Sequence, residues 1–108
     1  MIIKFTKKDL NMIMEIWLDT NIKTHSFIPK NYWINNFEMV KKALLDAEIY
    51  VFENDVSNQI DGFIGLTDNF IEGIFVKESA QSHGVGKRLL DYVKSFKPSL
   101  YLSVYKKI

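Results

Sequence analysis

The chain has 108 residues, enough for one domain, and its 47% hydrophobic and 25% charged residues are the proportions of an ordinary globular protein. The formal net charge of +1 argues against nucleic-acid binding, and the lack of cysteine excludes a disulfide framework, a thiolate metal site and a cysteine nucleophile. The N-terminus is too polar for a signal peptide, and no apolar run approaches the roughly 18 residues of a membrane span. We therefore expect one cytoplasmic domain without nucleic-acid or membrane partners.

The first half of the chain predicts a short strand and two helices. Residues 2–5 form the strand, and Thr6 with Asp9 makes a capping-box pattern before the first helix, expected to end near Thr20. The stripe of this helix repeats at helical spacing and comprises Leu10, Ile13, Met14, Trp17 and Leu18. A second helix is expected over residues 31–45, with the stripe Trp33, Phe37, Val40 and Leu44.

The second half is rich in β-branched and aromatic residues, which strands favour. The pattern predicts strands at 49–52, 60–67 and 70–76, then a helix at 85–96 and a last strand at 100–105. The expected buried face of that helix is Val85, Leu89, Leu90, Val93 and Phe96.

The expected order is therefore β-α-α-β-β-β-α-β. Short turns make the early strands antiparallel, and the final strand–helix–strand unit makes its two strands parallel. The fold class is α+β, with a mixed, mostly antiparallel sheet and helices packed on it.

The segment between the expected strand at 70–76 and the expected helix at 85–96 contains the residues that suggest a chemical function. Gln81, Ser82, His83, Gly84, Val85, Gly86 and Lys87 follow one another there. Glycines let an anion approach the backbone, and the first turn of a helix offers unpaired N–H groups and the positive end of its dipole. The sequence therefore predicts a phosphate site.

Two common phosphate motifs do not fit this segment. A Walker loop requires Ser or Thr where Arg88 stands, and a dinucleotide fingerprint requires a small residue where Leu89 stands. The remaining pattern, Gln81-x-x-Gly84-x-Gly86, resembles the acetyl-CoA motif of the GCN5-related N-acetyltransferase (GNAT) superfamily. The segment 71–76 resembles that family's fourth strand, and pieces such as residues 103–107 resemble its small bacterial YiaC/YjaB-like subgroup.

The resemblance implies acetyl-CoA as cosubstrate. Backbone groups of Ile74, Phe75 and Val76 would pair with the pantetheine arm as a strand does. Gln81 belongs to the motif, and the backbone amides of Ser82, His83, Gly84, Val85, Gly86 and Lys87 would hold the pyrophosphate. A solvated helix start is an equally good explanation of the Lys87 and Arg88 side chains.

The family pattern continues beyond this chain. After Lys107 it has an Asn-x-x-Ala helix, a Phe-Tyr pair whose tyrosine is the usual general acid, and two more strands, whereas the sequence stops at Ile108. We therefore expect residues 1–108 to be a C-terminally truncated acetyl-CoA-binding domain that lacks the final helix and two strands.

The resemblance also suggests positions for the amine substrate and for a base. Glu72 is the only carboxylate on the fourth strand, and by strand alternation it would share a face with Phe70, Ile74 and Val76. Phe70 would line the acyl or substrate pocket, while Phe27, Tyr32 and Trp33 would form a substrate lip, although packing explains them as well. His25 and His83 have no metal-ligand spacing, so no metal is expected.

Three functional interpretations follow. The first is an N-acetyltransferase that moves acetyl from acetyl-CoA to a primary amine, such as a protein lysine, by direct attack. The second is a catalytically impaired CoA-binding remnant. The third is a self-associating fragment, because an open last strand favours a homodimer or a swapped assembly.

Overall fold

The computed structural model describes residues 1–102 of the chain. Their sheet has five strands in the order β1-β2-β3-β4-β5. The strands are β1 (Ile2–Lys4), β2 (Glu48–Glu53), β3 (Ile60–Thr67), β4 (Phe70–Val76) and β5 (Tyr101–Leu102). Neighbours from β1 to β4 pair antiparallel, and β5 runs parallel to β4. The α+β class and the predicted mixed sheet are confirmed.

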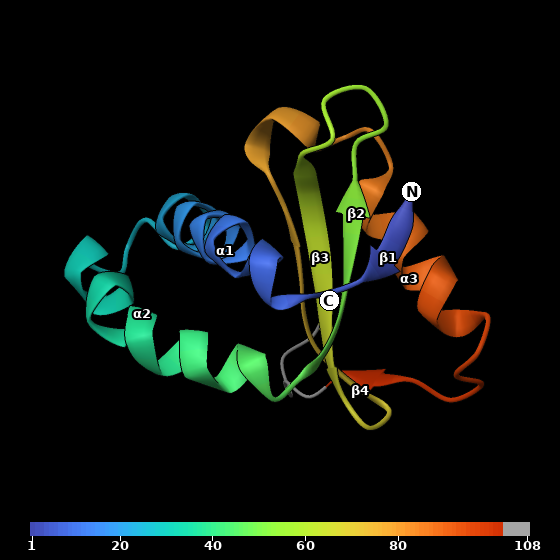
Figure 1. Cartoon of the computed structure of the whole chain (residues 1–108). Coiled ribbons are helices and arrows are strands. Elements are labelled where there is room, and N and C mark those ends of the chain that lie inside the picture. Colours follow the sequence, from blue (N-terminus) through green and yellow to red (C-terminus); the bar gives the residue numbers. More distant parts are fainter. Residues whose placement is uncertain (103–108) are drawn as a thin grey trace.

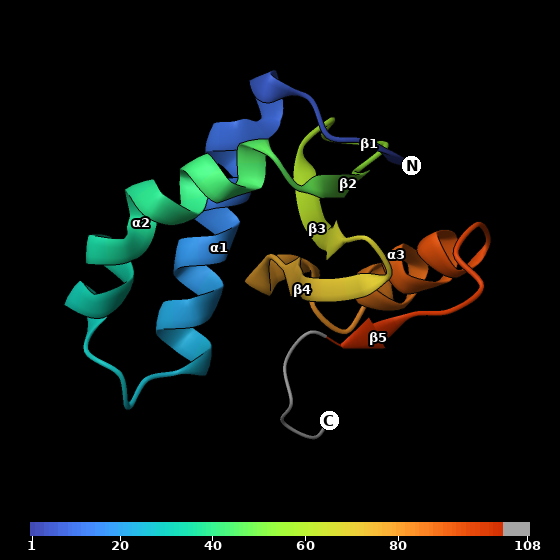
Figure 2. The same cartoon turned by 90° about the horizontal axis from the view of Figure 1, so that it is seen from below.

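The helices lie on the two faces of this sheet. They are α1 (Leu10–Thr24), α2 (Lys30–Leu45) and α3 (Val85–Lys94), with short 3-10 turns η1 (Lys7–Asp9) and η2 (Glu78–Ala80). Figure 1 shows α1 and α2 on one side of the strands and α3 on the other. The view from below in Figure 2 shows that α2 lies outside α1, away from the sheet.

Several predicted boundaries shift in the structure. Helix α1 continues to Thr24 because nothing near Thr20 breaks it, and the Thr20 hydroxyl bonds back to the Ile16 carbonyl at 2.7 Å. The Asp9 carboxylate accepts the Thr6 backbone N–H at 3.1 Å, as the capping box predicts, although it caps η1. Helix α3 ends at Lys94, and the part of the predicted last strand beyond Leu102 lies outside the described residues.

Two apolar clusters hold the faces together. On the α1 side, Ile13, Met14 and Trp17 pack with buried residues of β2 and β3. On the α3 side, Leu89 and Val93 pack with buried residues of β3 and β4. The predicted stripes are confirmed except at Phe96, which is 46% exposed and lies past the end of α3.

A β-bulge changes which β4 side chains share a face. Gly65 pairs with Gly73, but Leu66 pairs with Ile71, so Glu72 is the extra residue of the bulge. Ile71 therefore joins Ile74 and Val76 in the α3-side cluster. The prediction that Phe70 shares that face was wrong, because it assumed unbroken alternation, and Ile71 takes that place instead.

Within residues 1–102, no helix is both long and apolar enough to span a bilayer. The same residues contain no group of three His, Asp or Glu side chains arranged to hold a metal ion.

Candidate cofactor site

The loop from β4 to α3 turns through two left-handed residues. After η2 the chain reaches Ser82 at φ 70°, and Gly84 takes φ 81° immediately before the first residue of α3. Glycine adopts such angles without steric cost, whereas Ser82 carries strain. The loop can therefore turn sharply into the helix and present its backbone outward.

The backbone amides of residues 82–87 point to no protein acceptor. Among the described residues, the first hydrogen bond of α3 runs from the Arg88 N–H to the Gly84 carbonyl at 3.0 Å, and none is donated by the six amides before it. Successive unpaired N–H groups at a helix start, together with the helix dipole, form a site for an anion. This arrangement is the central feature of the candidate site.

The two motif glycines, Gly84 and Gly86, have different surroundings, which explain differently why each position holds glycine. A Cβ added to Gly84 would meet no atom within 4 Å, so this position opens to the outside of the loop. A Cβ added to Gly86 would lie 3.7 Å from methyl carbons of Ile74 and Val76, so Gly86 faces the sheet. Gly84 thus leaves room for a ligand, and Gly86 lets α3 pack closely on β4.

Gln81 has a defined contact inside the protein. Its side-chain Nε2 donates to the Val76 carbonyl at 3.0 Å. This bond joins the end of β4 to the last residue before the left-handed turn. The motif glutamine therefore fixes the loop through its side chain.

Strand β4 has two different edges. The Lys77 N–H donates to the Asp61 carbonyl at 2.8 Å on β3, and such bonded pairs alternate along an antiparallel ladder. By this alternation Phe75 directs its backbone groups toward β3, while Ile74 and Val76 direct theirs away from it. In the described part of the chain β5 pairs only with Phe70 and Ile71, so the edge at Ile74 and Val76 is not covered by β5.

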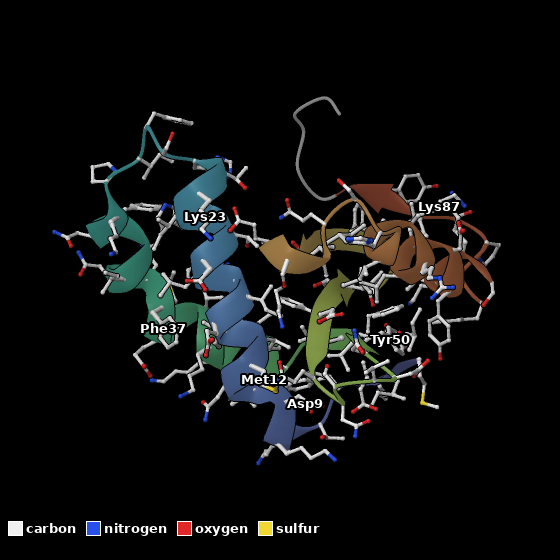
Figure 3. The ribbon with its side chains drawn as sticks, turned by 90° about the horizontal axis from the view of Figure 1, so that it is seen from above. Asp9, Met12, Lys23, Phe37, Tyr50 and Lys87 are labelled. Carbon is white, nitrogen blue, oxygen red and sulfur yellow. The ribbon has the colours of Figure 1, made fainter. Side chains whose placement is uncertain are left out.

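A cavity of about 610 Å³ lies between α1 and the start of the loop. Its lining includes Glu15, Asp19 and Gln81. Lys23 of α1 reaches across to Glu78 of η2 at 2.6 Å, and this hydrogen bond is the main reason that the pKa of Lys23 is raised. Figure 3 shows Lys23 on the side of α1 that faces η2, with Lys87 on the far side of the loop.

Lys87 is engaged within its own helix. Its Nζ lies 2.7 Å from the Asp91 carboxylate, and this bond lowers the pKa of Asp91. His83 lines a second cavity, on the other side of the loop. Arg88, the next residue of α3, lies over the Phe52 ring at 5.8 Å.

The predicted substrate-lip residues do not form one group with Phe70. Trp33 packs edge-on against Trp17 with ring centroids 5.9 Å apart, and His25 stacks on Trp33 at 5.6 Å. Phe27 is 81% exposed in the connection between α1 and α2. Phe70 instead contacts Tyr101 of β5 at 5.6 Å.

Glu72 is exposed at the bulge, on the part of β4 next to the uncovered edge. Sequence reasoning missed Asp61 and Lys77, which meet beneath the loop. The signal for Asp61 was available, since it is a carboxylate at the start of an otherwise apolar strand.

The α+β sheet with helices on both faces agrees with the comparisons with known proteins. The model of the acetyltransferase (GNAT) family matches residues 10–104, and the chain belongs to this family. It is therefore an acyltransferase by family, of the N-acetyltransferase type.

Particular relatives narrow the subgroup. The chain is 35% identical to the peptidyl-lysine N-acetyltransferase YiaC of Escherichia coli K12, over 99% of this chain and 73% of YiaC. It is 26% identical to YjaB of Salmonella typhimurium, over 85% of this chain and 63% of that protein. The predicted YiaC/YjaB-like subgroup is confirmed.

Solved structures share the fold. The solution structure of apo YjaB from Escherichia coli superposes with a TM-score of 0.80 at 24% identity, over 93% of this chain and 67% of that one. The crystal structure of a possible acetyltransferase from Clostridium difficile 630 superposes with a TM-score of 0.74 at 19% identity, over 99% of this chain and 80% of that one.

Proposed function

We propose that this chain binds acetyl-CoA and transfers the acetyl group to a primary amine. The observation that carries the proposal is the row of amides at residues 82–87 that have no acceptor within residues 1–102, beside the part of the β4 edge that β5 does not pair with in the same residues. The diphosphate of CoA matches such a row, because several N–H groups and a helix dipole favour an extended anion.

The pantetheine arm would extend along β4 from the diphosphate. Its two amide groups match the outward backbone groups of Ile74 and the outward N–H of Val76, whose carbonyl already accepts from Gln81, as in the addition of a strand to a sheet edge. We assign no such pairing to Phe75, whose backbone faces β3. The thioester would then lie near the bulge, where Glu72 is exposed.

The proposed chemistry is a direct transfer without an acyl-enzyme. The amine nitrogen attacks the thioester carbonyl carbon, a C–N bond forms, the C–S bond breaks, and the CoA thiolate takes a proton. Only an unprotonated amine can attack, and we propose that Glu72 accepts its proton, directly or through water. The fold contributes mainly by holding the two reactants in position.

We propose lysine side chains of proteins or peptides as the acceptors. The names of YiaC and YjaB specify peptidyl-lysine as their substrate, and this chain resembles YiaC along almost its whole length. A lysine side chain is a primary amine on a long flexible stem, so it can reach a thioester inside a cleft.

Binding and turnover are tested separately. In calorimetry, we expect Gly84→Ala to weaken CoA binding about tenfold, since a side chain at a left-handed residue costs roughly 1–3 kcal/mol and fills the open side of the loop. Gly65→Ala is the matched control, because its methyl would also meet no atom within 4 Å and Gly65 lies in β3, outside the loop. Wild-type protein that does not bind CoA would contradict the whole proposal.

Turnover is followed as free CoA thiol with a lysine peptide and acetyl-CoA. The chain contains no cysteine, so a thiol reagent reports the product alone. We expect release that depends on the peptide and is reduced by Gly84→Ala. CoA binding without release from any lysine peptide would contradict transfer to lysine.

A further inference from the structure

Asp61 is a buried carboxylate without a role in the cofactor site described so far. It is 8% exposed at the start of β3, next to Ile60 and Gly62, which are buried too. The other buried polar residues of the described chain serve their own helices: Asp9 bonds Thr6, and Asn21 bonds the Trp17 carbonyl. Asp61 instead connects segments that are distant in sequence.

Asp61 contacts Lys77, the first residue of the loop between β4 and α3, which is called the phosphate loop below. Its Oδ1 lies 3.6 Å from Nζ of Lys77, and its carbonyl accepts the Lys77 N–H at 2.8 Å. Lys77 is the residue between β4 and η2, and its own carbonyl accepts the Ala80 N–H at 2.9 Å. Asp61 thus holds the residue at which the chain leaves the sheet and enters the loop.

The second carboxylate oxygen of Asp61 reaches the β2–β3 hairpin. Asn54 donates its side-chain N–H to Oδ2 at 3.0 Å. The Asn54 side-chain oxygen in turn accepts the backbone N–H groups of Val56 and Ser57 at 2.8 and 3.1 Å. The hairpin loop and the phosphate loop are therefore joined through one carboxylate.

This network lies beneath the candidate site. The cavity of about 540 Å³ beside it is lined by Asp61, Lys77 and Asn54, and also by His83 of the loop and by Val85, the first residue of α3. The Asp61 side chain is 11% exposed, whereas Lys77 is 36% exposed and also donates to Oε1 of Gln59 at 3.4 Å, so this half-buried ion pair adds little net stability. Removing Lys77 takes the opposite charge away from a buried carboxylate, so the benefit of the pair is that it favours one arrangement of Asp61 and Lys77.

We infer that Asp61 is a positioning residue that fixes Lys77, and through it the direction of the loop amides 82–87, for binding the CoA diphosphate. This inference rests on the proposed function. Asp61 acts through Lys77 and does not itself touch the cofactor. Anion recognition by converging amides depends on their angles, so a small rotation of the loop at Lys77 weakens several hydrogen bonds together.

The test compares D61N and K77M with D55N as the control. Asp55 is a carboxylate of the same hairpin whose side chain is 80% exposed. We expect D61N to raise the Kd for CoA and the KM for acetyl-CoA about tenfold, with kcat at saturation unchanged. We expect a similar rise for K77M, which removes the amine of a side chain that is 36% exposed and keeps most of its aliphatic part. We expect no change for D55N. The double variant should bind CoA no more weakly than the single variant with the lower affinity, because both substitutions remove the same interaction.

Amide NMR spectra of the unliganded chain provide a second measurement. We expect the resonances of residues 82–87 to shift in D61N and K77M and to stay in place in D55N. Should D61N fail to fold, K77M carries the same test from a more exposed position.

The outcomes separate the two proposals. If D61N and K77M lower the free energy of unfolding but bind CoA as tightly as wild type, the role of Asp61 is structural and the inference is overturned alone. If the wild-type chain does not bind CoA, the proposed function is overturned and the inference with it.

Discussion

Helices α3 and α2 are attached to the same domain in very different ways. The ten residues of α3 include three buried side chains, with Leu89 and Val93 at 0% exposure. The sixteen residues of α2 include none that is buried. Figure 2 shows the reason, since α3 lies directly against the strands and α2 contacts the domain through α1.

This difference bears on the site. The anion site consists of backbone groups at the start of α3, and such groups bind well only if the helix is held rigidly. The connection between α1 and α2, with exposed Phe27, and the start of α2, with exposed Tyr32, belong to the loosely held half. Regions with few buried contacts open at low free-energy cost, so we expect α2 to adjust to an acceptor more easily than α3 does.

The largest expected effect contrasts equivalent truncations in the two helices. Leu89→Ala removes a fully buried side chain and should lower the free energy of unfolding by about 2–5 kcal/mol. Leu44→Ala in α2 removes one that is only partly buried, and it should cost less than about 2 kcal/mol. Urea unfolding of both variants measures the contrast. Equal losses would show that α2 is held as firmly as α3.

An intermediate effect is expected where the end of α3 meets β2. Tyr50, labelled in Figure 3, packs against Tyr92 and Phe96 and donates its hydroxyl to Glu48. Tyr50→Phe removes this hydrogen bond and should cost about 1 kcal/mol at neutral pH. A Tyr50→Phe chain as stable as wild type in urea would show that this contact does not hold α3.

The same pair predicts a pH dependence. Burial, and then the hydrogen bond to Glu48, raise the pKa of Tyr50 to about 12. Its contribution is therefore complete below the ordinary tyrosine pKa of about 10 and is lost as the pH rises toward 12. Burial alone would raise the pKa of Glu48, but bonds from Tyr50 and Lys97 lower it, so its contribution is lost on acidification through that lowered pKa. Unfolding curves from pH 8 to 11.5 should show a loss in wild type that is smaller in Tyr50→Phe.

The smallest effect is expected at the contact between α2 and α1. The indole Nε1 of Trp33 is buried and has no hydrogen-bond partner among the described residues. Trp33→Phe removes this unsatisfied donor, which offsets the lost apolar area, so stability should change by less than about 1 kcal/mol. Trp33→Leu also removes the edge-on contact with Trp17 and should cost more. Thermal unfolding of both variants measures this difference. An equal loss of stability in the two variants would mean that the ring contact contributes little.

Much of the fold could be predicted because its signals are local. The stripe of α1, the capping box and the turns between β2, β3 and β4 depend on residues within a few positions of one another. The bulge at Glu72 could not be predicted, because it depends on the register between two strands. One extra residue was enough to reverse the face on which Ile71 lies.

The candidate site shows the same division. The positions of Gly84 and of the loop followed from the motif, since a left-handed residue before a helix is a local requirement. The different role of Gly86, which faces Ile74 and Val76, depends on how α3 packs on β4. The hydrogen bonds of Gln81 to the Val76 carbonyl and of Lys87 to Asp91 were likewise not predicted from the sequence.

The sequence by itself thus determined the order of elements, the family and the loop that offers its amides, because spacing and backbone preference act over short distances. Only the tertiary structure decided which half of the domain is firmly held, which β4 backbone groups point away from β3, and that Asp61 lies under the loop. These properties arise from pairing between segments far apart in the chain, such as the contact of Asp61 with Lys77.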